Sequence, residues 1–314
     1  MNTSPSHPIR IGTRGSDLAL WQARAVRDAL MQAHGWPETA LTITVIKTTG
    51  DRITDRALLE AGGKGLFTKE IEEALLAGDI HLAVHSAKDM PTRLPDGLTL
   101  AAYLPRADIR DALIARSVAR LEDLPEGARV GTASLRRAAL IRRQRPDLKT
   151  ELIRGNVPTR LAKVADGEFD ATLLAAAGLH RLGLQGEITE LLDTDRFPPA
   201  CGQGAVTIEC RADDVATRDM LAAIDHQPTR QAVSCERAFL DVLDGSCRTP
   251  IAGLAEVSGP TVRFHGLVLS PEGDESHQGS AEGPAADAAA IGRDAGLAVR
   301  GRLPAALLQR LGLS

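Results

Sequence analysis

The sequence predicts an α/β fold, with two related α/β units followed by a smaller α+β unit. Three observations support this prediction. Short apolar segments alternate with segments of helical periodicity up to about residue 180, which is typical of strand–helix–strand units. Residues 11–18 resemble residues 130–135, which indicates that the first two units are related. Beyond about residue 230, two neighbouring strands and an Ala-rich helix replace the alternation.

The first unit begins with a strand at residues 9–11 and a helix at 18–34, for which Ser16 is the natural N-cap. A strand at 41–47 follows, so these elements predict a parallel pair joined by a right-handed crossover. The other expected elements are a glycine-rich loop at 62–65, a helix at 68–77 and strands at 80–84 and 98–104.

The second unit starts within the charged segment 105–111. Its expected elements are a strand ending at 132, a basic helix at 135–145, a strand at 150–153, a helix at 158–166 and a strand at 169–175. The Pro- and Gly-containing segment 197–204 suits a second crossing between the two α/β units, which would form a hinge.

The third unit is predicted to be small and antiparallel. Its expected elements are a helix at 232–243, strands at 251–257 and 262–269, a helical segment at about 285–302 and a short final helix. We therefore expect three domains, at residues 1–104 plus about 203–224, at 105–202 and at 225–314.

Composition excludes several classes of protein. A net charge of −4, from 37 basic and 41 acidic residues, argues against nucleic-acid binding. No apolar stretch approaches the ~20 residues of a membrane span and the polar N-terminus has no signal core, so we expect a cytoplasmic protein without a membrane partner. The cysteines show no CxxC spacing, so neither a metal site nor a disulfide framework is predicted.

The basic residues are nevertheless concentrated in particular places. Five arginines fall within residues 136–145, and several cations follow the carboxyl ends of predicted strands, where ligands of open α/β sheets bind. The residues at such ends are Arg14, Lys88, Arg136, Arg154 and Arg181. This pattern favours a small polyanionic ligand, whereas Arg142, Arg143 and Arg145 are more simply explained as a solvated helix face.

Residues 85–91, His-Ser-Ala-Lys-Asp-Met-Pro, follow a buried strand and are the main candidate for chemistry. Ser86 is a good N-cap and Pro91 cannot continue a helix, so a single helical turn is expected. It would direct Lys88 and the carboxylate of Asp89 toward whatever lies above the sheet. The alternative interpretation is a capped surface turn with a Lys–Asp pair.

Seven motifs occur together in order along the chain. They are Gly12-Thr13-Arg14 with Leu18-Ala19-Leu20-Trp21-Gln22-Ala23, Gly62-Gly63-Lys64-Gly65-Leu66-Phe67, His85-Ser86-Ala87-Lys88-Asp89, Gly131-Thr132-Ala133-Ser134-Leu135-Arg136-Arg137, Arg154-Gly155-Asn156-Val157-Pro158-Thr159-Arg160-Leu161, Gly202-Gln203-Gly204-Ala205 and Gly245-Ser246-Cys247. Through these motifs the sequence resembles the porphobilinogen deaminase family, also called hydroxymethylbilane synthase. One departure is Glu60, where many members of the family have Lys, so no substrate contact is expected there.

The resemblance implies a transferase with two domains like those of periplasmic binding proteins and a smaller third domain. No exposed apolar stripe stands out in the sequence, so a monomer is expected. It implies a dipyrromethane cofactor attached by a thioether to Cys247, which lies in a polar loop beside Arg248. Cys201, Cys210 and Cys235 are expected to be inert buried thiols. Such an enzyme joins four porphobilinogen molecules head to tail, with loss of ammonia each time, and then releases hydroxymethylbilane.

The resemblance also assigns roles to individual residues. Asp89 matches the catalytic aspartate, which would stabilise positive charge on pyrrole nitrogens, and Phe67 would stack on a ring. Each porphobilinogen carries an acetate and a propionate, which arginine can bind through bidentate contacts. The residues expected to bind the carboxylates of cofactor and substrate are Arg14, Lys64, Ser86, Lys88, Thr132, Ser134, Arg136, Arg137, Arg154, Arg160 and Arg181.

Two other functions compete with this interpretation. A non-catalytic, hinge-type protein that binds small anions would explain the two α/β units and the arginines, but not Cys247 or the third unit. A nucleic-acid-binding module would explain the basic helix at 135–145, but not the net negative charge.

Overall fold

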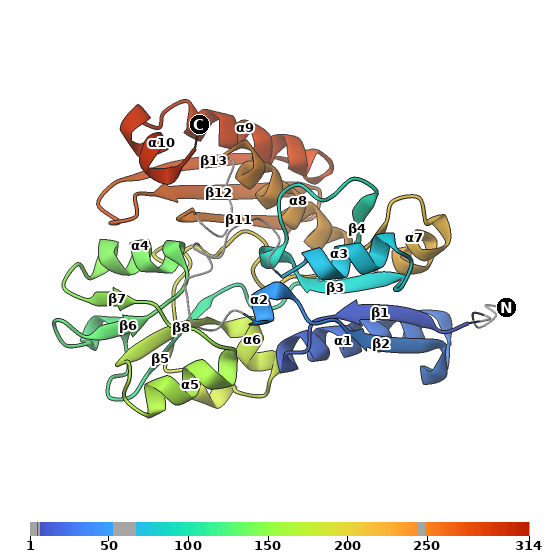
Figure 1. Ribbon diagram of the computed structural model, residues 1–314. Helices are drawn as coiled ribbons and strands as arrows, with labels where there is room; N and C mark the ends of the chain where they lie inside the picture. Colours follow the sequence, from blue (N-terminus) through green and yellow to red (C-terminus); the bar gives the residue numbers. More distant parts are fainter. Residues whose placement is uncertain (1–4, 6, 53–66, 244–248, 314) are drawn as a thin grey trace. The chain divides into compact units, whose positions relative to one another are not determined.

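The computed structural model describes residues 5, 7–52, 67–243 and 249–313 (Figure 1). The chain divides into two compact units, Met1–Arg106 with Ala205–Arg230 and Ala107–Gly204 with Gln231–Ser314. The first unit contains a five-stranded sheet, and the second contains a five-stranded and a three-stranded sheet. The predicted fold class, with two α/β parts and a smaller α+β part, is confirmed.

The sheet of the first unit has the strand order β2-β1-β3-β10-β4. Its strands are β1 (Ile9–Thr13), β2 (Leu41–Val45), β3 (Leu82–Ser86), β4 (Leu98–Tyr103) and β10 (Val206–Arg211). β1 runs parallel to β2, as the strand–helix–strand pattern predicted, and it is also parallel to β3. β10 was not predicted, and it lies antiparallel between β3 and β4.

Helix α1 (Asp17–His34) connects β1 to β2 and packs on the sheet (Figure 1). Ser16 caps it, since its Oγ accepts a hydrogen bond from the backbone N–H of Ala19 at 3.3 Å. Gly35 ends it in the left-handed conformation at φ 68°, a usual helix stop. The other helices of this unit are α2 (Thr49–Arg52), α3 (Lys69–Leu76) and α7 (Val215–Ala222), with short 3-10 turns at Glu38–Ala40 and Ala87–Asp89.

The five-stranded sheet of the second unit has the order β7-β6-β8-β5-β9. Its strands are β5 (Asp111–Ala115), β6 (Arg129–Gly131), β7 (Lys149–Glu151), β8 (Ala171–Ala175) and β9 (Glu190–Leu191). It repeats the design of the first sheet, because β6 is parallel to β7 and β8 while β5 is antiparallel to β8. Its helices are α4 (Leu135–Gln144), α5 (Val157–Ala165) and α6 (Ala176–Arg181), with 3-10 turns at Leu121–Asp123 and Gln185–Glu187.

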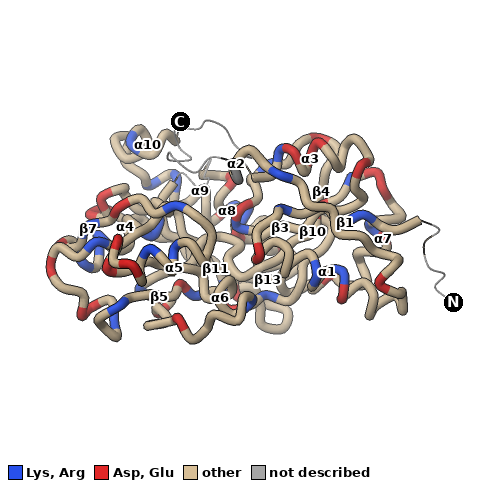
Figure 2. The backbone as a smooth tube through the Cα atoms, turned by 60° about the horizontal axis from the view of Figure 1, so that its bottom comes forward, with Lys and Arg blue, Asp and Glu red and all other residues tan. Residues whose placement is uncertain are grey.

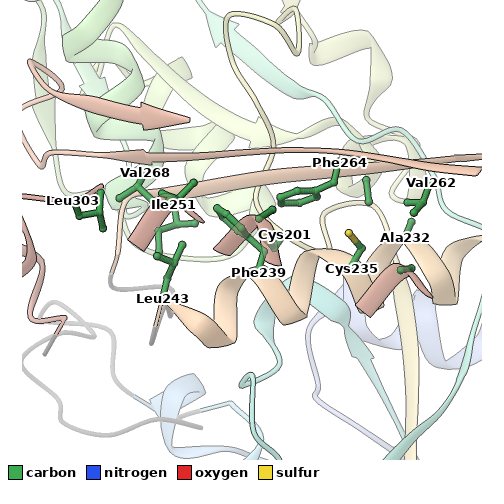
Figure 3. Close-up of a cluster of buried hydrophobic side chains, with 14 of the residues drawn as sticks. Cys201, Ala232, Cys235, Phe239, Leu243, Ile251, Val262, Phe264, Val268 and Leu303 are labelled. Carbon is green, nitrogen blue, oxygen red and sulfur yellow. The ribbon is translucent and has the colours of Figure 1, made fainter. Parts of the chain in front are cut away.

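The three-stranded sheet is antiparallel, in the order β11 (Ile251–Ser258), β12 (Thr261–Leu269) and β13 (Ser276–Pro284). The sequence had not indicated β13, whose run of Gly, Ser and Glu carries little apolar pattern. Helices α8 (Gln227–Val242), α9 (Ala288–Arg300) and α10 (Ala305–Leu311) complete this part, with a 3-10 turn at Ala285–Asp287. Figure 3 shows apolar side chains of α8 directed at the sheet, among them Cys235 and Phe239.

Close contact between α8 and the sheet depends on a glycine. The Phe239 ring lies 4.8 Å from the Phe264 ring, centroid to centroid. A Cβ atom at Gly266 would come within 2.4 Å of the Phe239 ring, so only glycine fits at this point of β12.

Charged residues of both signs are distributed along the two units (Figure 2). Acidic residues are prominent on α3, which carries Glu70, Glu72 and Glu73. Among the helices in the described ranges, none has the length and apolar character needed to cross a membrane.

Candidate active site

The segment 85–91 forms the turn that the sequence predicted. β3 ends at Ser86, and residues 87–89 make one 3-10 turn closed by a hydrogen bond from Met90 N–H to the Ala87 carbonyl. The Ala87 N–H donates to the Ala205 carbonyl at 3.0 Å, which fixes the turn to the chain that enters β10. Ala87 and Met90 are buried, whereas Asp89 is exposed. The backbone therefore holds the Asp89 carboxylate out of the apolar core.

Ser86 occupies the N-cap position, but its side chain makes no capping hydrogen bond. Instead, its Oγ accepts a hydrogen bond from Gln22 Nε2 at 2.8 Å. Gln22 is a polar residue on the buried face of α1 and is only 2% exposed. The prediction of a side-chain cap was therefore wrong, because the helix next to β3 offers the hydroxyl a better-placed donor.

One pocket of the first unit brings several predicted residues together. Its lining includes Arg14, Phe67, Ser86 and Asp89, with Gln22 and His85 beside them. Arg14 follows β1 and Asp89 follows β3, and these parallel neighbours end at the same edge of the sheet. The pocket thus combines a guanidinium, a hydroxyl and a carboxylate, which suits a ligand that has both anionic groups and N–H groups.

Phe67 already has a cationic neighbour in this pocket. The Arg14 guanidinium carbon lies 4.2 Å from the centroid of the Phe67 ring, a cation–π distance. This contact would fix the direction of the Arg14 side chain. It also covers one face of the ring that was predicted to stack on a pyrrole.

His85 forms the buried wall of the pocket. Its Nε2 lies 3.0 Å from Oε2 of Glu209, and the two side chains are 4% and 0% exposed. Glu209 comes from β10, which the sequence did not reveal, so this pair was not predicted. The sequence did contain one indication of this pair, because Glu209 lies inside the apolar run 205–210. A carboxylate buried in such a strand needs a polar or charged partner.

In the second unit, Arg136 and Arg137 on α4 are buried and share the carboxylate of Asp111. Arg136 Nη2 lies 2.7 Å from Oδ2 of Asp111, and Arg137 Nη2 lies 2.7 Å from Oδ1. Each arginine also donates to a backbone carbonyl, that of Pro198 at 2.6 Å and that of Leu173 at 2.8 Å. Both side chains are therefore parts of the fold as well as candidate ligand-binding groups.

The charge of this cluster remains positive, because two guanidinium groups face one carboxylate. Burial alone would raise the pKa of Asp111, but Arg136 and Arg137 outweigh it and hold this pKa well below its ordinary value. Arg136 Nε is buried and has no acceptor among the residues described. The site thus keeps one excess positive charge that an anionic ligand could compensate.

Thr132 and Ser134 organise the start of α4. Thr132 Oγ1 accepts a hydrogen bond from Ser134 N–H at 3.1 Å, and Ser134 Oγ accepts one from Arg137 N–H at 3.4 Å. Ser134 therefore caps α4, as the sequence predicted.

Arg154, Arg160 and Arg181 also belong to the second unit and are half-buried. Arg160 Nε donates to the Gly155 carbonyl at 2.9 Å, and Arg181 Nη2 donates to the Gly204 carbonyl at 2.7 Å. Burial lowers the pKa of Arg181 to about 10, which leaves the group charged at neutral pH. Lys88, in the first unit, is half-buried as well.

Two predicted residues, Lys64 and Cys247, lie outside the described residues. Cys201, Cys210 and Cys235 are buried, and none of them forms a disulfide with another described residue. In the described ranges, no group of three or more His, Cys, Asp or Glu side chains could hold a metal ion.

The comparisons with known proteins assign the family. The family model "Porphobilinogen deaminase, dipyromethane cofactor binding domain" matches residues 9–219, and "Porphobilinogen deaminase, C-terminal domain" matches residues 230–300. The chain belongs to the porphobilinogen deaminase family. A relative named porphobilinogen deaminase, from Nitrobacter hamburgensis, is 57% identical over 292 residues, which cover 93% of this chain and 92% of that protein.

Among solved structures, the chain is similar to a putative methionine-binding lipoprotein from Bacillus subtilis, with a TM-score of 0.43 and 14% identity over 69% of this chain and 89% of that one. It is also similar to a TRAP periplasmic solute binding protein from Ralstonia eutropha, with a TM-score of 0.40 and 12% identity over 70% and 76% of the two chains.

The cofactor of the porphobilinogen deaminase family, a dipyrromethane, fits the chemistry of the donor groups. It consists of two linked pyrrole rings, whose N–H groups need acceptors and whose carboxylates need cations. In the first unit, Asp89 offers an exposed acceptor beside the cation Arg14. In the second unit, the cluster of Arg136, Arg137 and Asp111 keeps an excess positive charge.

Proposed function

We propose that this member of the porphobilinogen deaminase family joins four porphobilinogen molecules head to tail and releases hydroxymethylbilane in tetrapyrrole biosynthesis. One observation carries the proposal beyond family membership. Arg14 comes from one motif and Ser86 and Asp89 from another, and all three line a single pocket. This grouping supplies a binding group for carboxylates and a carboxylate for pyrrole N–H groups at one place.

In this proposal Asp89 is the catalytic carboxylate. Loss of ammonia from porphobilinogen leaves an electron-poor carbon, and its attack by another pyrrole places positive charge on ring nitrogens. A fixed carboxylate beside these N–H groups stabilises the charge as it develops. The turn at residues 87–89 supports this role, because Ala87 and Met90 anchor it while Asp89 stays accessible.

Arg14 and Ser86 would hold the carboxylates of the reacting ring, with Lys64 and Lys88 adding positive charge. The substrate brings two carboxylates per ring, so the growing chain needs more cations with each addition. Arg154, Arg160 and Arg181 are the half-buried arginines of the second unit that we propose for this purpose. Thr132 and Ser134 would contribute mainly by placing Arg137, since their hydroxyls serve the start of α4.

The dipyrromethane supplies the pyrrole that starts elongation, and we propose Cys247 as its attachment residue. The described cysteines are poor alternatives. Burial raises the pKa of Cys210 to about 11 and that of Cys235 to about 12, so neither thiol forms a nucleophilic thiolate near neutral pH.

We further propose that the chain works in the cytoplasm as a monomer, with porphobilinogen as its partner and no metal, nucleic acid or membrane. Cys201, Cys210 and Cys235 form no disulfide with another described residue, which is compatible with a reducing compartment. The exposed large apolar side chains belong to separate elements, for example Trp21 on α1, Leu76 on α3 and Leu297 on α9.

A stoichiometry assay tests the proposed activity. Purified protein is incubated with porphobilinogen, and ammonia and the linear tetrapyrrole are quantified by mass spectrometry over time. We expect about four ammonia molecules for each tetrapyrrole. Tight binding of porphobilinogen without any ammonia release would instead support the anion-binding alternative.

A further inference from the structure

The pocket that contains Asp89 has a second ionisable group, His85. His85 lies on β3, directly before Ser86, and belongs to the lining of this pocket. Its side chain is 4% exposed. Nε2 faces Oε2 of Glu209 at 3.0 Å, and this is the one hydrogen bond recorded for the ring among the described residues. Nδ1 makes no hydrogen bond with any described residue.

Glu209 is placed to control the ring. It is fully buried on β10, and its Oε1 has no hydrogen-bond partner among the described residues. An ionised Glu209 would receive the Nε2–H of the imidazole, which leaves a lone pair on Nδ1. The same carboxylate would stabilise the imidazolium once Nδ1 gains a proton, as in carboxylate–histidine pairs that act as bases.

Glu72 on α3 is the other carboxyl group near this pair. Burial, and to a smaller extent the neighbouring Glu209, raises the pKa of Glu72, while His85 acts in the opposite direction. The remaining charged groups of the pocket are Arg14 and Asp89. The imidazole thus lies near two buried carboxyl groups, and His85 belongs to the lining of the pocket.

We propose that His85 accepts the proton that leaves the α-carbon of the attacking pyrrole ring, with Glu209 as its positioning residue. This inference rests on the proposed function. It divides the work between two groups, because an imidazole is a stronger base than a carboxylate. Asp89 then serves the pyrrole N–H groups, and His85 carries the proton.

The step balances without any other reactant. The C–N bond of the ammonium form of porphobilinogen breaks, and ammonia leaves with the electron pair. The attacking pyrrole ring supplies the electrons of the new C–C bond. Its α C–H bond then breaks, the electron pair restores the aromatic ring, and the proton passes to Nδ1 of His85. The imidazolium finally protonates the released ammonia, which departs as ammonium.

The tautomer of His85 can be measured without any turnover. Full-length protein is labelled with ¹⁵N-histidine, and long-range ¹H–¹⁵N spectra are recorded at pH 8, with His85→Asn used to assign the ring. We expect the tautomer with the proton on Nε2, and a shift toward the other tautomer in Glu209→Gln. A proton on Nδ1 at pH 8 in the native protein would overturn the proposal.

The proton transfer itself is tested with porphobilinogen deuterated at its free α-carbon. His85→Asn alone leaves Glu209 buried without its partner, so this single variant could fail to fold. The double variant His85→Asn with Glu209→Gln removes both partners and is therefore used for the kinetic test. For the double variant we expect kcat to fall by about 10²-fold or more, KM to change little and a deuterium effect on kcat to appear. A purely structural role would raise KM or lower the folded fraction without an isotope effect, and that result would contradict the proposal.

His81→Asn is the matched control. His81 precedes β3, accepts a hydrogen bond from Arg10 N–H at 3.0 Å through Nδ1 and is not part of the pocket lining. We expect unchanged kcat and no isotope effect in this variant. The two proposals also fail differently, because a native protein that releases no ammonia refutes the activity, whereas an active protein with an unaffected double variant refutes only the role of His85.

Discussion

Gln22 on α1 donates a hydrogen bond to Ser86 at the end of β3, with 2.8 Å between Nε2 and Oγ. The two residues are 64 positions apart, yet both line the pocket that contains Asp89. The amide therefore fixes the direction of the Ser86 hydroxyl, which we propose as a contact for a substrate carboxylate.

This contact predicts a binding defect in Gln22→Ala. Loss of the donor frees the Ser86 hydroxyl to rotate, and one hydrogen bond contributes about 0.5–1.5 kcal/mol. We expect KM for porphobilinogen to rise roughly two- to tenfold, with a smaller change in kcat, in steady-state assays of ammonia release. Gln32→Ala, an exposed position on the same helix, is the control and should behave like the native enzyme. Equal KM values for the two variants would exclude the Gln22 contact from substrate binding.

Asp89→Asn is predicted to separate binding from chemistry. The amide keeps the size of the side chain but removes the negative charge that stabilises the pyrrole nitrogens. We expect porphobilinogen to bind nearly as tightly and turnover to fall by about 10²–10⁴-fold. Asp96→Asn, an exposed aspartate beyond the pocket lining, should be fully active. Turnover of Asp89→Asn near the native level would remove this residue from the mechanism.

Covalent attachment of the cofactor is tested by intact-mass measurement. We expect the purified protein to be heavier than its sequence by two linked pyrrole units, and Cys247→Ser to lack this increment. Cys235→Ala is the control, because burial raises the pKa of that thiol to about 12 and makes it unreactive. An active protein with the mass of the bare chain would refute thioether attachment.

Asp111→Asn is predicted to destabilise the second unit. Removal of the charge leaves Arg136 and Arg137 buried without their carboxylate, and breaking a buried ion pair in this way costs about 3–5 kcal/mol. Denaturant unfolding followed by circular dichroism measures the loss. Asp170→Asn, an exposed acidic position of the same unit, is the control and should lose little stability.

The stability difference between the native protein and Asp111→Asn is predicted to depend on pH. The folded pKa of Asp111 is depressed, so its contribution is complete above the ordinary value of 3.8 and is lost as pH falls toward the folded value. The difference in unfolding free energy between native protein and Asp111→Asn should therefore shrink below about pH 4. A difference that grows as the pH is lowered would contradict the assigned ion pairs.

The sequence was sufficient for the elements that depend on local patterns. Ser16 and the apolar spacing on α1 marked that helix, and the apolar run before His85 marked β3. The antiparallel strands β5 and β10 were not identified, since their partners lie far away in the chain and periodicity carries no information about pairing. His85 and Glu209 are 124 positions apart, so the pair was hidden for the same reason.

Residue roles were harder to predict than residue positions. Arg136 and Arg137 were expected to face ligand carboxylates, but the structure shows that Asp111 already shares their charge. Asp111 had appeared only as part of a charged segment at a unit boundary. Burial decides whether an arginine serves the fold or a ligand, and a single sequence does not contain that information.

The position of β10 also constrains how the protein can be made on the ribosome. Among the described strands, β4 pairs only with β10, and the Ala87 N–H donates to the carbonyl of Ala205, which precedes β10. A nascent chain that ends before residue 205 therefore contains every residue of the pocket lining. It still lacks β10, the strand that pairs with both β3 and β4. We expect the edges of β3 and β4 to stay exposed until then, which makes this interval of synthesis the one most sensitive to aggregation.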